Sequence, residues 1–133
     1  MPRSLNRFLT AVTVVVHLSV PVAAQADASD YDLTLVETTY PFGSEAVLDL
    51  RLTDTRTGLP VDGAILFATR LDMAPEGMVE MTSPVAILPA EAPGQYRFAA
   101  DPTMEGNWQF SVAAKVQGEA ETVQARFLIE VQP

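Results

Sequence analysis

The chain has 133 residues, of which 8 are Lys or Arg and 17 are Asp or Glu, so its formal net charge is −9. Such a surface repels nucleic acid and anionic lipid, and it favours solubility or cationic partners. Cysteine is absent, which excludes a disulfide framework and a thiolate metal site. The length suits one domain whose stability comes from packing alone.

The N-terminal segment has the three parts of a secretory signal peptide. Arg3 and Arg7 form a basic start, an apolar run covers residues 8–22, and small residues lead up to Ala24 and Ala26. A membrane-anchoring helix is the alternative. The run, however, has about 15 residues, whereas a membrane span needs about 20. We therefore expect export and cleavage after Ala24 or Ala26.

This interpretation divides the chain into a signal peptide, residues 1–26, and a periplasmic domain, residues 27–133, with no membrane insertion after cleavage. The only histidine, His17, leaves with the signal peptide. The domain then lacks both imidazole and thiol, which are the usual groups for acid–base catalysis, nucleophile activation and zinc binding. We predict that the protein is not an enzyme.

Beyond residue 30, apolar residues recur at every second position, which is typical of half-buried strands. These runs, separated by Pro and Gly turns, cover residues 31–35, 48–52, 65–71, 85–88, 96–98, 108–116 and 123–131. In the third run, Ile65, Phe67 and Leu71 are expected to share one face. The pattern predicts an all-β fold, an immunoglobulin-like antiparallel β-sandwich of about seven strands.

Four methionines are the candidate metal ligands: Met73, Met78, Met81 and Met104. Pro75 and Gly77 predict a loop in the middle of the first three, and loops lie on the surface. Thioether sulfur is a soft ligand that suits Cu(I) and Ag(I), and it does not form disulfides in an oxidising compartment. The cluster therefore predicts a Cu(I) or Ag(I) site.

The predicted topology indicates whether the four methionine side chains lie at the same end of the sandwich. If each strand crosses the sandwich once, Met73, Met78 and Met104 lie in loops at the same end, with Met81 just inside the next strand. Trp108 would begin its strand at this end, where it could lie against a bound cation. Packing is the alternative, because methionine often fills irregular cores, and Met73 and Trp108 continue the alternation of their neighbours.

The second half of the chain also resembles a known family. The motifs that carry the resemblance are Thr57-Gly58-Leu59-Pro60-Val61-Asp62-Gly63-Ala64, Asp72-Met73-x-Pro75-x-Gly77-Met78, Pro93-Gly94-x-Tyr96-Arg97-Phe98, Met104-x-Gly106-x-Trp108 and Ala113-Ala114-Lys115-Val116-Gln117-Gly118-Glu119. They are similar, over roughly residues 45–131, to the YtkA-like/FixH-like domain. The resemblance implies an immunoglobulin-like domain outside the cytoplasmic membrane, associated with copper supply or heavy-metal efflux. The methionines that match the family motif are Met73, Met78 and Met104.

Two hypotheses of function follow. The first is a periplasmic accessory protein that binds Cu(I) or Ag(I) through its methionines and hands the ion to a protein partner in an efflux or assembly system. The second is a metal-free interaction module that docks on a membrane-complex partner through the apolar loop residues Pro41, Phe42 and Met78.

Overall fold

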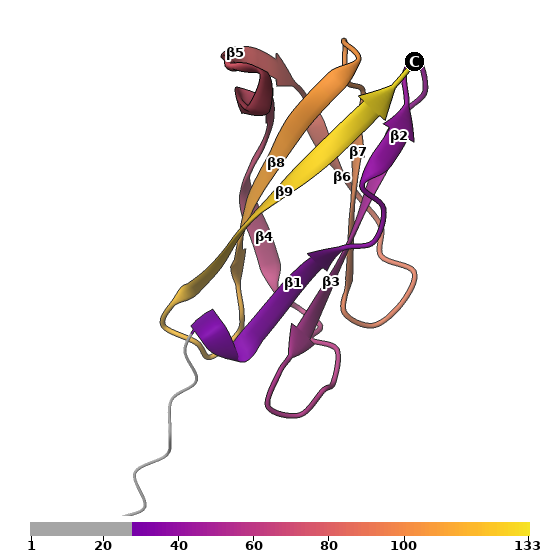
Figure 1. Ribbon diagram of the computed structural model, residues 1–133. Coiled ribbons are helices and arrows are strands. Elements are labelled where there is room, and N and C mark those ends of the chain that lie inside the picture. The colour runs from indigo at the N-terminus through magenta and orange to yellow at the C-terminus, as the bar shows by residue number, and fades with distance from the viewer. Residues whose placement is uncertain (1–27) are drawn as a thin grey trace, which may run out of the picture.

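The computed structural model of the chain describes residues 28–133, which form two β-sheets packed face to face (Figure 1). One sheet has the strand order β1-β3-β7-β6, and the other has the order β2-β9-β8-β4-β5. The strands are β1 (Tyr31–Leu35), β2 (Thr39–Pro41), β3 (Ala46–Asp54), β4 (Ile65–Met73), β5 (Met78–Ser83), β6 (Val85–Leu88), β7 (Gln95–Ala100), β8 (Gly106–Lys115) and β9 (Thr122–Gln132). Two short 3₁₀ helices, η1 (Ala28–Asp30) and η2 (Ala74–Glu76), complete this part of the chain.

The predicted all-β, immunoglobulin-like sandwich is confirmed, although residues 28–133 contain nine strands rather than about seven. The first addition is β2, a three-residue strand that pairs with β9 in parallel. The second is β5, which is separated from β6 by Pro84. Proline has no N–H to continue a ladder, and at this residue the chain passes from one sheet to the other. The predicted signal peptide lies outside the described residues.

Strand β4 corrects one predicted side-chain pattern. Ala68 has a φ of 51°, and the stretch from Phe67 to Arg70 is one residue longer than the stretch of β8 that it faces. Such a bulge reverses the inward and outward positions that follow it. Phe67 is 42% exposed, whereas Leu71 is 1% exposed. The prediction that Ile65, Phe67 and Leu71 share a face is therefore wrong.

The core lies between the sheets and is built by the strands whose alternation was clearest. The inward side chains of β3 and the first inward side chains of β8 are fully buried: Leu48, Leu50, Leu52, Trp108 and Phe110. Across the sheets, the rings of Phe98 and Phe110 lie 5.7 Å apart, centre to centre, at an interplanar angle of 57°. Tilted aromatic pairs at this separation are favourable. This rigid core fixes where the loops emerge at each end.

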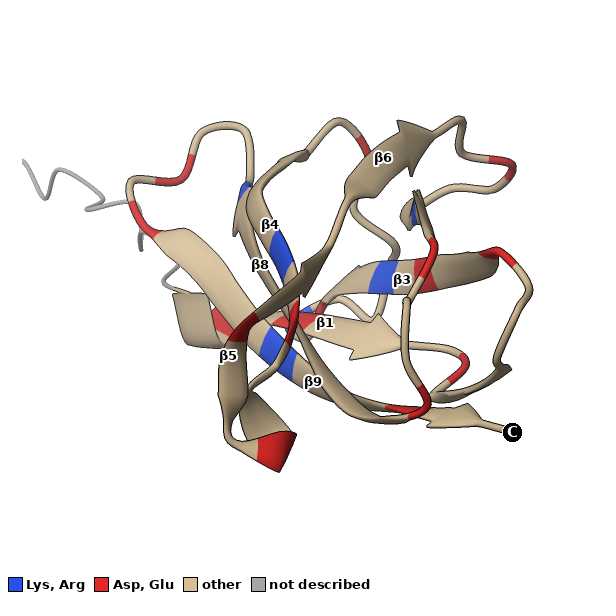
Figure 2. Cartoon of the chain, turned by 90° about the horizontal axis from the view of Figure 1, so that it is seen from above, with Lys and Arg blue, Asp and Glu red and all other residues tan. Residues whose placement is uncertain are grey.

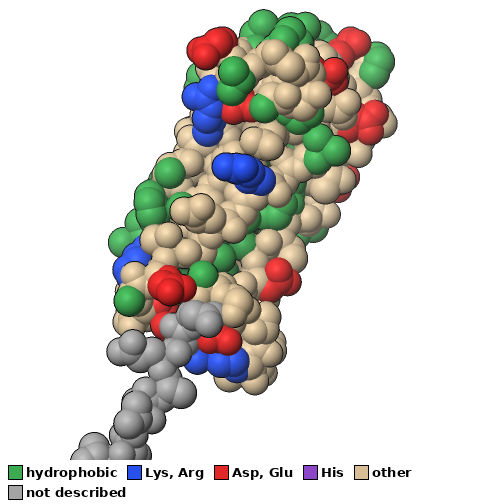
Figure 3. Space-filling view, turned by 60° about the vertical axis from the view of Figure 1, so that its left-hand side comes forward, with side chains coloured by type: hydrophobic (Ala, Val, Ile, Leu, Met, Phe, Trp, Pro, Cys, Tyr) green, Lys and Arg blue, Asp and Glu red, His purple; other side chains and the backbone are tan. Residues whose placement is uncertain are grey.

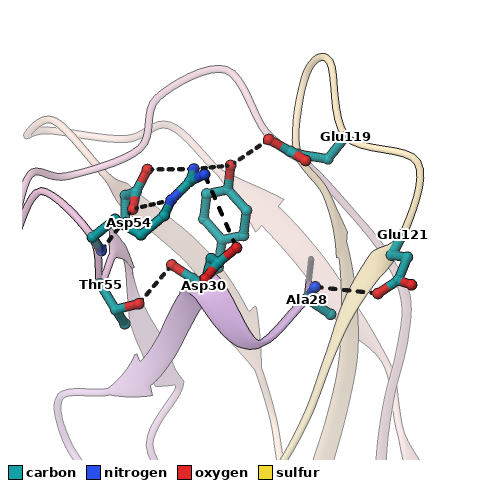
Figure 4. A network of polar contacts seen from close by, with 8 residues as sticks. Ala28, Asp30, Asp54, Thr55, Glu119 and Glu121 are labelled. Atoms are coloured by element: carbon teal, nitrogen blue, oxygen red, sulfur yellow. Dashed lines mark hydrogen bonds and ion pairs between the residues drawn. The ribbon is translucent and has the colours of Figure 1, made fainter. Parts of the chain in front are cut away.

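The beginning of the described chain is fastened at one end of the sandwich (Figure 4). Tyr31 donates a 2.7 Å hydrogen bond to Glu119, and Arg56 pairs with Asp54 at 2.9 Å. The carboxylate of Glu119 raises the pKa of Tyr31, and the Arg56 guanidinium lowers the pKa of Asp54. The helix η1, at the indigo start of the coloured ribbon in Figure 1, lies at the end opposite β5. Within residues 28–133, no helix is long and apolar enough to cross a membrane.

Candidate functional site

Three of the four predicted methionine ligands lie at one end of the sandwich, drawn at the top of Figure 1. Met73 ends β4 and Met78 begins β5, and the two are paired in register across these strands. Met104 lies in the loop just before β8. The methyl carbon Cε of Met73 lies 3.2 Å from the position that a Cβ on Gly106 would take. The backbone at Gly106, where the Met104 loop enters β8, therefore lies against the Met73 side chain.

The four methionines differ in their access to solvent. Met73 is 1% exposed and belongs to the core, and Met81 is half-buried against that core. Met78 and Met104 are 37% and 39% exposed. Met78 and Met104 are therefore the accessible thioethers, Met73 is a core side chain, and Met81, in the middle of β5, packs partly against that core.

Trp108 is a core residue rather than a cation contact. Its side chain is fully buried, and its indole Nε1–H donates a 3.0 Å hydrogen bond to the main-chain oxygen of Met104. The ring therefore holds the Met104 loop in place from beneath. This agrees with the packing alternative for Trp108 and leaves the indole face inside the core.

A second fastening joins the two methionine-bearing loops directly. Oε1 of Glu76, the last residue of η2, accepts hydrogen bonds of 2.9 Å from both the main-chain N–H and the side-chain Nδ2 of Asn107. Gly106 has a φ of 124°, and a Cβ there would stand 3.3 Å from the same Glu76 oxygen. A glycine is needed for this backbone conformation and this close approach. Sequence reasoning did not single out Glu76 or Asn107, because only the fold brings them together.

This end of the sandwich carries acidic side chains in its connecting segments and no basic ones. Residues 42–45, 74–80 and 101–105, which cover two loops, η2 and the start of β5, contain no Lys or Arg. Their carboxylates belong to Glu45, Glu76, Glu80, Asp101 and Glu105. The ion pairs found among residues 28–133 use none of these carboxylates. Figure 2, which looks down on this end, shows red on η2 and the neighbouring loops, whereas blue bands lie along strands such as β3 and β9. Uncompensated carboxylates around exposed thioethers raise the local concentration of cations.

The structure separates the residues of the second hypothesis. Pro41 ends β2, and β2 and β5 are the two edge strands of the same sheet. Neighbouring strands lie about 4.8 Å apart, so Met78 and the Pro41–Phe42 pair are roughly 19 Å apart across this sheet. They share an end of the sandwich and do not form one continuous apolar surface.

A hollow of about 360 Å³ lies elsewhere, at the open seam between β4 and β6. Its apolar lining includes Ile65, Leu66, Ile87 and Phe98. The hydroxyl of Tyr96, which also lines it, already accepts a hydrogen bond from the Ala64 N–H and donates one to the Val61 carbonyl. The seam offers apolar contact with few free polar groups. Separately, residues 28–133 contain no group of three or more His, Cys, Asp or Glu placed to hold a metal ion.

Replacing Glu76 with alanine is expected to remove both bonds to Asn107 and to lower the free energy of unfolding by about 1 kcal/mol. Glu76→Gln keeps an oxygen acceptor and should retain most of that stability. Urea unfolding measures the difference, and amide hydrogen exchange over residues 101–107 reports whether the loop has loosened. Equal losses in the two variants would show that the charge of Glu76, and not its hydrogen bonds, matters.

The fold is similar to that of several solved structures. The solved structures include the Lin-41 filamin domain, with a TM-score of 0.46 and 16% identity over 82% of this chain and 98% of that chain. Domains 4 and 5 of the S-layer protein SbsC have a TM-score of 0.48 and 13% identity over 77% of this chain and 45% of that one. The ZirS C-terminal domain has a TM-score of 0.48 and 10% identity over 100% of this chain and 87% of that one.

No curated protein matches the chain. A family model does match, and it is described as YtkA-like. The match covers residues 25–113, so it starts earlier and ends earlier than the motifs in the sequence suggested. It includes each of the four methionines, η2 and the Glu76–Asn107 contact. The chain belongs to the YtkA-like family.

Proposed function

We propose that this protein is a periplasmic accessory protein that binds Cu(I) or Ag(I) through methionine thioethers. The proposed ligands are Met73, Met78, Met81 and Met104, and the partner is a protein of a metal-efflux or copper-delivery system. The proposal includes no catalytic step. One observation carries it: at an end of the sandwich whose loops contain no Lys or Arg, Met78 and Met104 are exposed, and Met78 is paired in register with the buried Met73.

The donor chemistry favours a soft ion. Thioether sulfur binds Cu(I) and Ag(I) and is a poor ligand for hard cations. The sulfur is uncharged, so the charge of a bound ion must be balanced by its surroundings. The carboxylates of Glu76, Glu80 and Glu105 lie on the segments that bear Met78 and Met104, and they would supply that balance through space.

The exposed and the buried methionines would have different roles in binding the ion. Met78 and Met104 are open to solvent and would take up or release the ion. Met73 would contribute from beneath, and Met81, half-buried in β5, is the most distant of the four from the Met104 loop in its strand position. A site with two exposed ligands would exchange its ion readily, as a protein that passes metal to a partner requires.

Anaerobic Cu(I) titration tests the proposal. The double variant Met78→Leu and Met104→Leu should lower Cu(I) affinity by at least roughly 10–100-fold, the loss already typical of residues that only support a metal ligand. Exchange of methionine for leucine conserves volume, so the free energy of unfolding should change by less than about 1.5 kcal/mol. Met81→Leu provides the matched comparison, and a smaller loss is expected there. An unchanged affinity in the double variant would refute the metal site.

A second candidate function is a metal-free interaction module, and the exposed apolar side chains of Met78, Val79 and Met104 favour it. In that case the protein would bind its partner equally well with and without Cu(I), and leucine at positions 78 and 104 would leave binding intact because the surface stays apolar. The Cu(I) titration therefore separates the two functions.

A further inference from the structure

Exposed apolar side chains and unpaired carboxylates occur together around the methionine site. Met78, Val79 and Met104 are 37%, 49% and 39% exposed, and we call these three residues the methionine patch. In Figure 3, hydrophobic side chains gather at the upper end of the molecule and acidic side chains stand on either side of them. An apolar centre within a charged rim is the usual anatomy of a protein–protein interface.

The segments that carry this patch are held in place before any partner arrives. Glu76 binds Asn107 through two hydrogen bonds, and Trp108 binds the main-chain oxygen of Met104. Arg70 donates a 2.6 Å hydrogen bond to the carbonyl oxygen of Val79 and so holds the beginning of strand β5 in place. A surface that is already ordered loses little conformational entropy on binding.

The charge around the patch selects among possible partners. Its rim carries Glu80, Glu105 and Asp101, which take part in no ion pair among the described residues. Arg70, the cation on the adjacent part of β4, is already paired with Asp72 at 2.6 Å. Nucleic acid, anionic lipid and a second copy of the same patch would each bring like charge against this rim, which is unfavourable.

We propose that the methionine patch is the docking surface for a protein partner whose matching face has an apolar centre surrounded by Lys and Arg. This inference rests on the proposed function, because the same patch holds the exposed ligands from which the ion would pass. Docking there brings the partner's centre against Met78 and Met104 and shields the ion from water during transfer. The first described element, η1, lies at the opposite end of the sandwich (Figure 1).

Metal-free binding of a defined probe tests the docking surface without depending on Cu(I). The probe is a short synthetic peptide with a Leu-Met-Leu centre between lysine-rich flanks, and its control carries glutamate in place of lysine. Calorimetry at low salt measures affinity, and amide shifts in the ¹⁵N-labelled protein locate the contact. The lysine peptide should bind with shifts centred on residues 76–80 and 101–107, and the glutamate peptide should not bind.

Charge variants give the matched comparison. Glu80→Lys and Glu105→Lys each reverse one rim charge and should weaken the lysine peptide at least about tenfold. Asp32→Lys makes the same change in net charge on β1, away from the patch, and should leave affinity within about threefold. Equal weakening by Asp32→Lys, or shifts centred on the opposite end, would overturn the docking surface, as would no binding up to about 1 mM peptide. If the peptide binds as expected but the Cu(I) titration fails, the interaction surface stands and the metal function does not.

Discussion

Replacing Trp108 with alanine is expected to lower the free energy of unfolding by about 3–5 kcal/mol, the usual cost of truncating a large buried aromatic residue. The side chain is fully buried between the sheets, at the start of β8. A domain of this size has a total stability of about 5–15 kcal/mol. The variant would therefore retain its fold with a small margin, or it would be partly unfolded at room temperature.

The substitution of Trp108 is also expected to affect the methionine patch. The indole N–H of Trp108 binds the main-chain oxygen of Met104, so its loss frees the loop that carries the exposed ligand. Trp108→Phe separates the two effects, because phenylalanine keeps most of the apolar volume and removes the hydrogen bond. We expect a loss of about 1–2 kcal/mol in that variant. Urea unfolding monitored by far-ultraviolet circular dichroism measures both variants, since neither retains the tryptophan.

A loss below about 1 kcal/mol in Trp108→Ala would contradict the buried position of the ring. If Trp108→Phe is as stable as the unaltered protein and its Met104 loop exchanges amide hydrogens no faster, the hydrogen bond to Met104 contributes nothing to the site.

Gly94→Ala is expected to produce the second large effect, a loss of about 2–5 kcal/mol. Gly94 has a φ of 70°, a conformation that costs a residue with a Cβ about 1–2 kcal/mol. A Cβ at this position would stand 2.6 Å from Cβ of Pro60 and 3.0 Å from the main-chain oxygen of Leu52. Relieving that overlap must move backbone, and overpacking adds about 1–3 kcal/mol.

Gly94 also makes two hydrogen bonds that hold the turn before β7. Its N–H donates a 2.6 Å hydrogen bond to Asp62, and its carbonyl oxygen accepts a 2.9 Å hydrogen bond from the Leu52 N–H. The substitution would therefore push the turn before β7 away from β3 and from the loop that follows β3, with effects beyond the site of the change.

Gly43→Ala is the control for Gly94→Ala. Gly43 has a φ of 82°, and nothing lies within 4 Å of the position that its Cβ would take. Only the conformational cost of about 1–2 kcal/mol is expected there. The difference between the two variants in thermal or urea unfolding measures the steric part alone. Equal losses would mean that the turn at Gly94 rearranges without cost.

The sequence by itself determined the fold class, because period-two alternation identifies the buried face of a strand without knowledge of its neighbours. The alternation in residues 108–116 and 123–131 corresponds to β8 and β9. The reading failed at β4, where the bulge at Ala68 inserts one residue and exchanges the two faces. A bulge shifts the alternation by one residue, and its position becomes certain only when the register of the partner strand is known.

The sequence likewise predicted one property of the candidate site, the shared end of its methionines, and left another undecided, how deeply each is buried. The spacing of the methionines and the alternation of loops between two ends were enough to expect Met73, Met78 and Met104 at one end, because a sandwich sends successive loops to opposite ends. The packing alternative foresaw a buried Met73, which belongs to the core, whereas the exposure of Met78 and Met104 was not predictable. Side-chain burial depends on what covers a strand, and local sequence does not carry that information.

The tertiary structure alone decided which residues support the methionine site. Glu76 and Asn107 are separated by 31 positions in sequence and are joined by two hydrogen bonds. Their meeting depends on the pairing of β4 with β8, which brings η2 against the beginning of β8. For residues 28–133 the sequence determined the donor chemistry, namely methionine without cysteine or histidine, because that chemistry belongs to the residues themselves. The positions of the methionine side chains, their burial and the hydrogen bonds that hold their loops are decided only when strands distant in sequence pack together.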